Sequence, residues 1–120
     1  MSAAAVIFAI ELALLFTHEM DAVRRQEWQM FIILKDMADE KAFRIFMLLH
    51  IPLYAVILSL LLSDRMIIAM YITDIFLILH MLIHFAFTGH KANQMNGGVS
   101  KAIIYSAGLL ALVHLPAITL

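Results

Sequence analysis

Apolar residues dominate four long stretches of the chain, and short polar segments separate them. The stretches cover residues of about 3–23, 42–63, 66–88 and 99–120. A helix needs about 20 mainly apolar residues to cross a bilayer, and each stretch has that length. Their apolar residues run continuously and do not alternate with polar ones, which favours helices over strands. We therefore predict an all-α fold, a multi-pass membrane four-helix bundle that forms one transmembrane domain over residues 1–120.

The links between the predicted helices are short, and only the first contains an apolar segment. Residues 28–34 (WQMFIIL) are too few to span a bilayer. Tryptophan prefers the interface between hydrocarbon and water, so we expect a short interfacial segment here, with Trp28 at headgroup level. The links at residues 63–65 and 89–98 are polar, and the second is rich in glycine and asparagine, which favours a loop.

Lysine and arginine are distributed unevenly between the two ends of the predicted bundle. One end has only Arg65, whereas the first and third links and their flanks have the other seven: Arg24, Arg25, Lys35, Lys41, Arg44, Lys91 and Lys101. Cytoplasmic loops are enriched in these residues, so the first and third links should be cytoplasmic. Both termini are then expected outside.

The overall composition supports a membrane protein and excludes several other classes. Hydrophobic residues make up 64 % of the chain and charged residues 14 %, whereas an average soluble domain is about 25 % charged. A soluble chain of 120 residues could not bury so much apolar surface. The net charge of −1 provides no basic field for nucleic acid. The absence of cysteine excludes disulfides and thiolate metal ligands.

Ionisable residues inside the predicted spans fall into two layers. A helix rises about 1.5 Å per residue, so sequence position converts to depth. Glu11, Asp74 and His114 are expected about 10–12 Å from the outer hydrocarbon edge, as a second polar layer. The other layer is expected at about 20–27 Å from that edge and contains His18, Asp21, His50, His80 and His84. Ionisable groups are costly inside a membrane, so both layers are candidate functional sites.

The layer nearer the cytoplasm has the residue types of a transition-metal site. His80 and His84 have the i, i+4 spacing with which one helix presents two metal ligands. His18 and Asp21 share one side of the first predicted helix, and His50 lies at a similar depth. We expect these five residues to form the site. Imidazole and carboxylate ligands suit a divalent transition metal, here zinc or iron.

The same residues allow interpretations without a metal. His18 oriented by Asp21, with Glu19 beside them, could act in acid–base catalysis. His80 and His84 could equally form a hydrogen-bonded pair in the core of the bundle. His50 and His114, each two residues before a proline, could satisfy backbone groups that the proline frees. The second polar layer could be a clasp between helices.

Two arginines follow the first predicted helix at headgroup level. Arginine pairs well with phosphate, and Arg24 and Arg25 lie one turn beyond Asp21. With Trp28, they are candidates for binding a lipid headgroup. Arginines at such positions are also common as determinants of topology and as lipid anchors.

The segment from Thr17 to Trp28 (THEMDAVRRQEW) carries a resemblance to known proteins. It resembles a family of small uncharacterised bacterial membrane proteins with four helices, whose first helix ends in a Thr-His-Glu-x-Asp-Ala motif. More distantly, it is similar to the uncharacterised HXXEE-motif membrane proteins. The resemblance implies a bacterial inner (cytoplasmic) membrane protein. It directs attention to His18, Glu19, Asp21 and Trp28 and implies no particular substrate.

Several functions remain open from the sequence. The first is a metal-dependent or acid–base enzyme that acts on a lipid or another apolar substrate. A second is a haem b protein in which His50 faces His80 or His84. A third is a non-catalytic subunit or assembly factor of a larger membrane complex. A fourth is an ion or proton path through the polar layers. Whatever the function, we expect membrane lipids as partners and either a homo-oligomer or a larger membrane complex.

Overall fold

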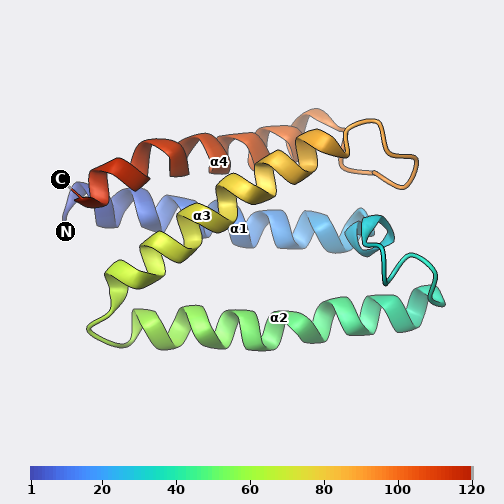
Figure 1. The fold of residues 1–120 in the computed structure, drawn as a ribbon, viewed down its shortest axis with the longest axis horizontal. Coiled ribbons are helices and arrows are strands. Elements are labelled where there is room, and N and C mark those ends of the chain that lie inside the picture. The colour runs from blue at the N-terminus through green and yellow to red at the C-terminus, as the bar shows by residue number, and fades with distance from the viewer. Residues whose placement is uncertain (120) are drawn as a thin grey trace.

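The computed structural model describes residues 1–119 and shows four long α-helices joined by short links (Figure 1). They are α1 (Ala3–Arg24), α2 (Asp39–Leu61), α3 (Met66–Ala86) and α4 (Gly98–Thr119), and a short 3₁₀ helix, η1 (Glu27–Met30), follows α1. The described residues contain no strand. The predicted all-α fold is therefore confirmed. Helix α2 begins earlier than residue 42 and α3 ends before residue 88, while the predicted end at residue 120 lies outside the described residues.

The helices run alternately in opposite directions, so the start of α1 and the end of α4 lie at the same end of the molecule (Figure 1). Helix α4 packs along both α1 and α3, and α3 crosses the molecule obliquely. Small residues of α4 allow this close approach. A Cβ atom at Gly108 would lie 2.6 Å from the Cβ atom of Met81 on α3. Helix α4 is thus the close neighbour of both α1 and α3, and we call these three helices the tight group.

Helix α2 lies on the side of the molecule away from α4 and packs less closely on its neighbours (Figure 1). It packs mainly on α3 and on η1, and Tyr54 contacts Phe16 of α1 edge to face. Cavities therefore remain between α2 and the other helices.

All four helices are long and apolar enough to cross a membrane. Large apolar side chains cover much of their outer surface, with Leu62, Phe85 and Val113 among the most exposed. Soluble proteins rarely expose continuous apolar surface of this extent. The composition of the helices and their outer surface are those of a membrane protein.

The chain turns sharply where α1 ends. Gln26 adopts the left-handed conformation, with φ of 55°, which is uncommon for a residue other than glycine. The backbone N–H of Arg25 still donates to the carbonyl of Asp21, so the helix is complete up to this turn. Glu27 follows immediately, and the turn directs its side chain back toward the interior of the bundle.

Trp28, which is predicted to lie at headgroup level, is buried against α2 inside the protein. Its ring is only 4 % exposed and packs against Phe43 and Phe46 of α2. Its Nε1–H donates to Asp39 Oδ1 at 2.9 Å. The indole thus has both an apolar environment and a hydrogen-bond partner inside the protein. The neighbouring Ile32 and Ile33 are the strongly exposed apolar residues of this link.

Candidate metal centre

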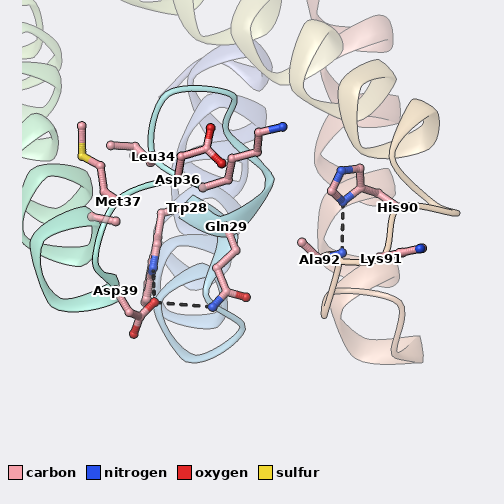
Figure 2. Close-up of a pocket in the computed structure, with 11 residues that line it drawn as sticks. Trp28, Gln29, Leu34, Asp36, Met37, Asp39, His90, Lys91 and Ala92 are labelled. Carbon is pink, nitrogen blue, oxygen red and sulfur yellow. Dashed lines mark hydrogen bonds between the residues drawn. The ribbon is translucent and has the colours of Figure 1, made fainter.

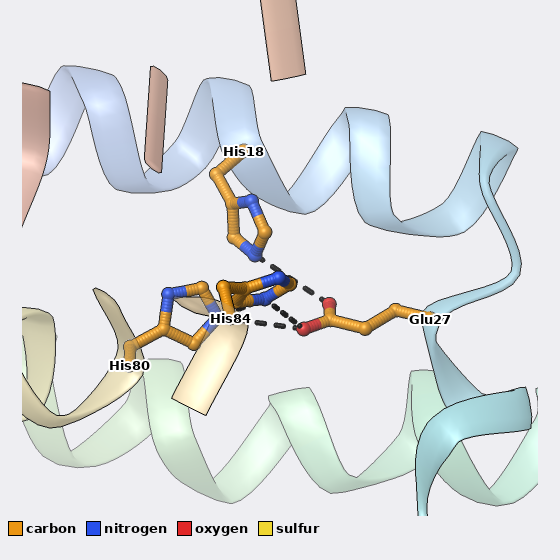
Figure 3. A group of neighbouring side chains, drawn as sticks. All are labelled: His18, Glu27, His80 and His84. Atoms are coloured by element: carbon orange, nitrogen blue, oxygen red, sulfur yellow. Dashed lines mark hydrogen bonds and ion pairs between the residues drawn. The ribbon is translucent and has the colours of Figure 1, made fainter. Parts of the chain in front are cut away.

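Three histidines and one glutamate meet near the end of the bundle where α1 joins η1 (Figure 3). His18 comes from the last third of α1, His80 and His84 from α3, and Glu27 from the first position of η1. Figure 3 shows the three rings and the carboxylate directed toward one another. One ligand atom from each residue lies within 4.8 Å of every other. We call these four residues the His18 cluster.

The carboxylate of Glu27 touches all three imidazoles. Its Oε1 atom lies 2.9 Å from Nε2 of His84 and 3.4 Å from Nε2 of His80. Its Oε2 atom lies 3.5 Å from Nε2 of His18. The Nε2 atoms of His80 and His84 are 3.1 Å apart. All three histidines therefore present the same ring nitrogen to one small volume.

These separations fit a common metal ion. Two nitrogen or oxygen ligands at about 2.0–2.1 Å from a tetrahedral zinc ion are about 3.3 Å from each other. The cluster is also well shielded, since His18, Glu27 and His84 are each at most 5 % exposed. Neither ring nitrogen of His18 has a hydrogen-bond partner among the described residues. Buried imidazole nitrogens normally have a partner, and a metal ion would supply one.

Glu27 is held in its charged form by the surrounding rings. Burial alone would raise the pKa of its carboxyl group, because desolvation disfavours the charged form. The interactions with His18, His80 and His84 outweigh burial and hold the pKa of Glu27 well below its ordinary value of 4.5. The carboxylate is therefore ionised at neutral pH, which is the form that binds metal.

Asp21 is separate from the cluster, contrary to the expectation from sequence. Its Oδ2 accepts a hydrogen bond from the hydroxyl of Ser100 on α4, and its Oδ1 lies 3.5 Å from Nε of Arg25. Asp21 is three residues beyond His18 and therefore about 60° around the helix. That offset turns it toward the start of α4, whereas His18 points toward α3.

His50 also lies outside the cluster, in a pair of its own. Its Nε2 atom contacts the carboxylate of Glu19, and its Nδ1 atom lies 2.7 Å from the carbonyl oxygen of Phe46. Both ring nitrogens are thus satisfied by α1 and α2. The structure joins Glu19 to His50 and leaves neither among the ligands of the His18 cluster.

An apolar cavity of about 270 Å³ adjoins the cluster between α2 and α3. Glu27 and His80 form part of its wall, as do Glu19 and His50. The remaining lining is apolar: Phe31, Phe46, Leu49, Leu53, Phe76 and Ile83. Two members of the candidate metal centre therefore face a cavity suited to an apolar molecule, and the Glu19–His50 pair lies beside it.

The arginines predicted to bind a headgroup lie on the surface at the same end. Arg24 and Arg25 are exposed, and Arg25 pairs with Asp21. A cavity of about 400 Å³ with a mixed polar and apolar lining lies nearby between η1 and the α3–α4 loop, and its walls include Trp28, Asp39, His90 and Lys91 (Figure 2). Neither arginine lines it, and it shares no residue with the His18 cluster.

The second polar layer also comes together. Glu11, Asp74 and His114 meet between α1, α3 and α4, and none of their side chains is exposed to solvent. This group is separate from the His18 cluster, because buried Leu15 and Leu77 of the apolar core lie between them along α1 and α3.

Glu27 is the member of the His18 cluster that sequence reasoning missed. It lies beyond the end of the first predicted span, so a depth calculated along that helix does not group it with His18, His80 and His84. An available signal was its place two residues after Arg25, between the arginine pair and an apolar segment. There, a break in the helix can turn an acidic side chain inward.

Comparison with known proteins identifies a family for this chain. No curated protein and no solved structure matches it. One family model does match, over residues 4–120, and its description is a family of unknown function (DUF6713). This agrees with the resemblance to an uncharacterised family. The match covers nearly the whole chain, and the chain therefore belongs to the family of unknown function DUF6713.

Proposed function

We propose that this chain is a multi-pass protein of the bacterial inner membrane that binds zinc or iron at the His18 cluster. The bound metal serves a reaction on a lipid or another apolar substrate that enters the cavity between α2 and α3. The observation that carries the proposal is the convergence of three Nε2 atoms and one carboxylate within 4.8 Å of one another.

The His18 cluster is unusual for a group that only joins helices. A pair of hydrogen-bonding side chains suffices to hold two helices together, and such pairs contribute modestly inside membranes. Here, three imidazoles and a carboxylate from α1, η1 and α3 share one point, and within residues 1–119 His18 has no hydrogen-bond partner. Three neutral imidazoles and one carboxylate offer four ligands and one negative charge to a divalent ion. This set suits zinc or iron better than calcium or magnesium, which prefer oxygen ligands.

The adjoining cavity supports a role in chemistry on an apolar molecule. Catalytic zinc can expand to five ligands, and non-haem iron keeps open positions for substrate. Glu27 and His80 line the cavity, so a metal that they held would lie close to it. An additional ligand, water or a substrate oxygen, would approach from that side. The metal would supply Lewis acidity or an activated water molecule there.

The residues around the cavity would also determine how a substrate lies in the proposed site. The apolar walls from α2 and α3 would hold a hydrocarbon chain, since ligand cavities are mainly apolar with a few placed polar groups. Glu19 and His50 would be those polar groups, together with Glu27. The exposed Arg24 and Arg25 lie at the same end and would interact with lipid phosphate.

The placement of positive charge supports an inner-membrane orientation with the His18 cluster near the cytoplasm. Seven of the eight lysine and arginine residues belong to the α1–α2 and α3–α4 links and their flanks. The positive-inside rule assigns that end to the cytoplasm and both termini to the outside.

Metal analysis of the purified protein tests the proposal. We expect the full chain in detergent to retain about one equivalent of zinc or iron that His80→Ala/His84→Ala lacks. His90→Ala is the matched control, because His90 is an exposed histidine on the following loop and lies outside the cluster. Equal metal content in all three proteins would disprove the site. A Soret absorption band in the wild type that His80→Ala/His84→Ala lacks would instead support bound haem.

A further inference from the structure

A second buried group of metal-ligating side chains lies in the other half of the bundle. Glu11 of α1, Asp74 of α3 and His114 of α4 are each fully buried, with 0 % exposure. One ligand atom from each lies within 4.8 Å of the other two. Each residue comes from a different helix of the tight group, so this Glu11 cluster lies where α1, α3 and α4 meet.

Hydrogen bonding within the Glu11 cluster leaves most of its polar atoms unsatisfied. The Nδ1 atom of His114 lies 3.0 Å from both Glu11 Oε2 and Asp74 Oδ1, but a ring nitrogen carries at most one hydrogen. Only the contact with Asp74 is a hydrogen bond. Both oxygens of Glu11, Oδ2 of Asp74 and Nε2 of His114 have no partner among the described residues.

The cluster also places two carboxylates beside a single cationic partner. Among the described residues, no lysine or arginine pairs with Glu11 or Asp74, whose charged partner is His114 alone. With both carboxylates ionised, the two carboxylates and one protonated imidazole would carry a net charge of −1, which either a proton on Glu11 or a bound divalent cation removes. A buried uncompensated charge is strongly destabilising. A divalent cation bound by two carboxylates and a neutral imidazole makes the same cluster neutral.

We infer that the Glu11 cluster is a second site for a divalent metal ion, and that it prefers manganese or iron. The unsatisfied oxygens of Glu11 and the convergence of the three side chains carry the inference. Two carboxylates and one imidazole form a more oxygen-rich ligand set than the His18 cluster, and oxygen ligands suit Mn²⁺. The ion would join α1, α3 and α4.

The two metal sites are independent. Glu11 and His18 are seven residues apart on α1, which corresponds to a rise of about 10 Å. The buried residues Leu15, Leu77, Ala107 and Ala111 form an apolar layer of the core between them. Two-metal catalytic sites hold their ions about 3.5–4 Å apart. The Glu11 cluster is therefore a separate mononuclear site with no direct part in the chemistry proposed at the His18 cluster.

Electron paramagnetic resonance of Mn²⁺ tests this site directly. The protein is the full chain in detergent carrying His80→Ala/His84→Ala, which removes ligands only from the other cluster. We expect about one bound Mn²⁺ per chain and a spin-echo modulation from one imidazole nitrogen. Glu11→Gln and Asp74→Asn should each weaken Mn²⁺ binding by about tenfold or more. His114→Gln should remove the nitrogen modulation.

Thr73→Val is the matched control. Thr73 is also buried on α3 and its hydroxyl has no hydrogen-bond partner, but it does not belong to the cluster. Its replacement should leave Mn²⁺ binding unchanged. Absence of Mn²⁺ binding in the parent protein, or equal affinity in Glu11→Gln and the control, would overturn the inference and indicate a proton shared between the carboxylates.

Two further measurements keep the outcome clear. Mn²⁺ should raise the thermal unfolding temperature of the parent protein, because a ligand that binds only the folded state stabilises it. If a variant fails to fold, the nitrogen modulation and this temperature shift in the parent protein decide the question. The metal content that His80→Ala/His84→Ala changes tests only the His18 cluster. Mn²⁺ binding in that double variant tests only the Glu11 cluster, so either hypothesis can fail without the other.

Discussion

The carboxylate of Glu27 lies 2.9 Å from the Nε2 atom of His84, although 57 positions separate the two residues in the chain. The contact joins the turn after α1 to the last turns of α3. The same carboxylate lies 3.4 Å from His80 and 3.5 Å from His18. Glu27 is thus the residue that brings the three imidazoles together at one point.

Replacing Glu27 should therefore impair metal binding more than any change in the surrounding loop. We expect Glu27→Gln to lower zinc affinity by about tenfold or more, because it removes the only negative charge among the four ligands. Isothermal titration of the purified protein with zinc measures this. Glu40→Gln is the control, since Glu40 is exposed and pairs only with Arg44. An equal affinity of the two variants would contradict a ligand role for Glu27.

Metal affinity should decline as the pH falls from 7 to 5. Imidazole must be neutral to bind metal, and histidine ordinarily titrates at about pH 6.5. Glu27 does not cause this decline. Its pKa is lowered, so the stabilising carboxylate is fully present above the ordinary value of 4.5 and is lost only as the pH falls through its lower folded value. Zinc titrations at several pH values check this, and affinity that stays constant down to pH 5 would contradict histidine ligation.

Filling the cavity between α2 and α3 should exclude an apolar ligand and leave the metal bound. Leu53 is a half-buried residue of α2 that lines this cavity. We expect Leu53→Trp to reduce labelling by a photoreactive fatty acid severalfold, because the larger side chain fills the space that the hydrocarbon chain of the fatty acid would occupy. The control is Leu58→Trp, on the same helix and outside this cavity. Unchanged labelling of Leu53→Trp would argue against the cavity as the substrate site.

Single cysteines report the orientation in the membrane, because the chain contains no cysteine of its own. Asp64 lies in the α2–α3 link and Gly97 in the α3–α4 loop, and both are exposed. In intact cells, a maleimide that cannot cross the inner membrane should label Asp64→Cys and should label Gly97→Cys only after lysis. The reverse pattern would place the His18 cluster at the outer face.

Much of the fold follows from the sequence, because it depends on local and strong signals. Four apolar stretches of spanning length correspond to the four helices, and the i, i+4 spacing of His80 and His84 places both on one face of α3. Depth counting correctly grouped Glu11, Asp74 and His114, since all three lie inside long helices and the helical rise fixes their distance along each axis.

The sequence misplaced some site residues because depth in the membrane does not tell which neighbour a side chain faces or how far apart two helices lie. Asp21 and His50 lie at suitable depths, but Asp21 faces α4 and His50 contacts Glu19. The pattern of apolar residues does not predict that α2 packs less closely on the other helices. Glu27 depends on the left-handed turn at Gln26, and propensity gives no indication of such a turn at a glutamine. Trp28 is buried because Asp39 and two phenylalanines of α2 surround it, which is a tertiary effect.

X-ray absorption spectroscopy of the zinc- or iron-loaded wild-type protein tests the His18 cluster most directly. We predict a first shell of nitrogen and oxygen atoms at about 2.0–2.1 Å for zinc, with outer-shell scattering from three imidazoles. His80→Ala/His84→Ala should lose the metal of the His18 cluster and the scattering from three imidazoles, while His90→Ala retains both. A purified, folded protein that binds neither metal, or a bound metal without imidazole scattering, would contradict a metal centre built from these residues.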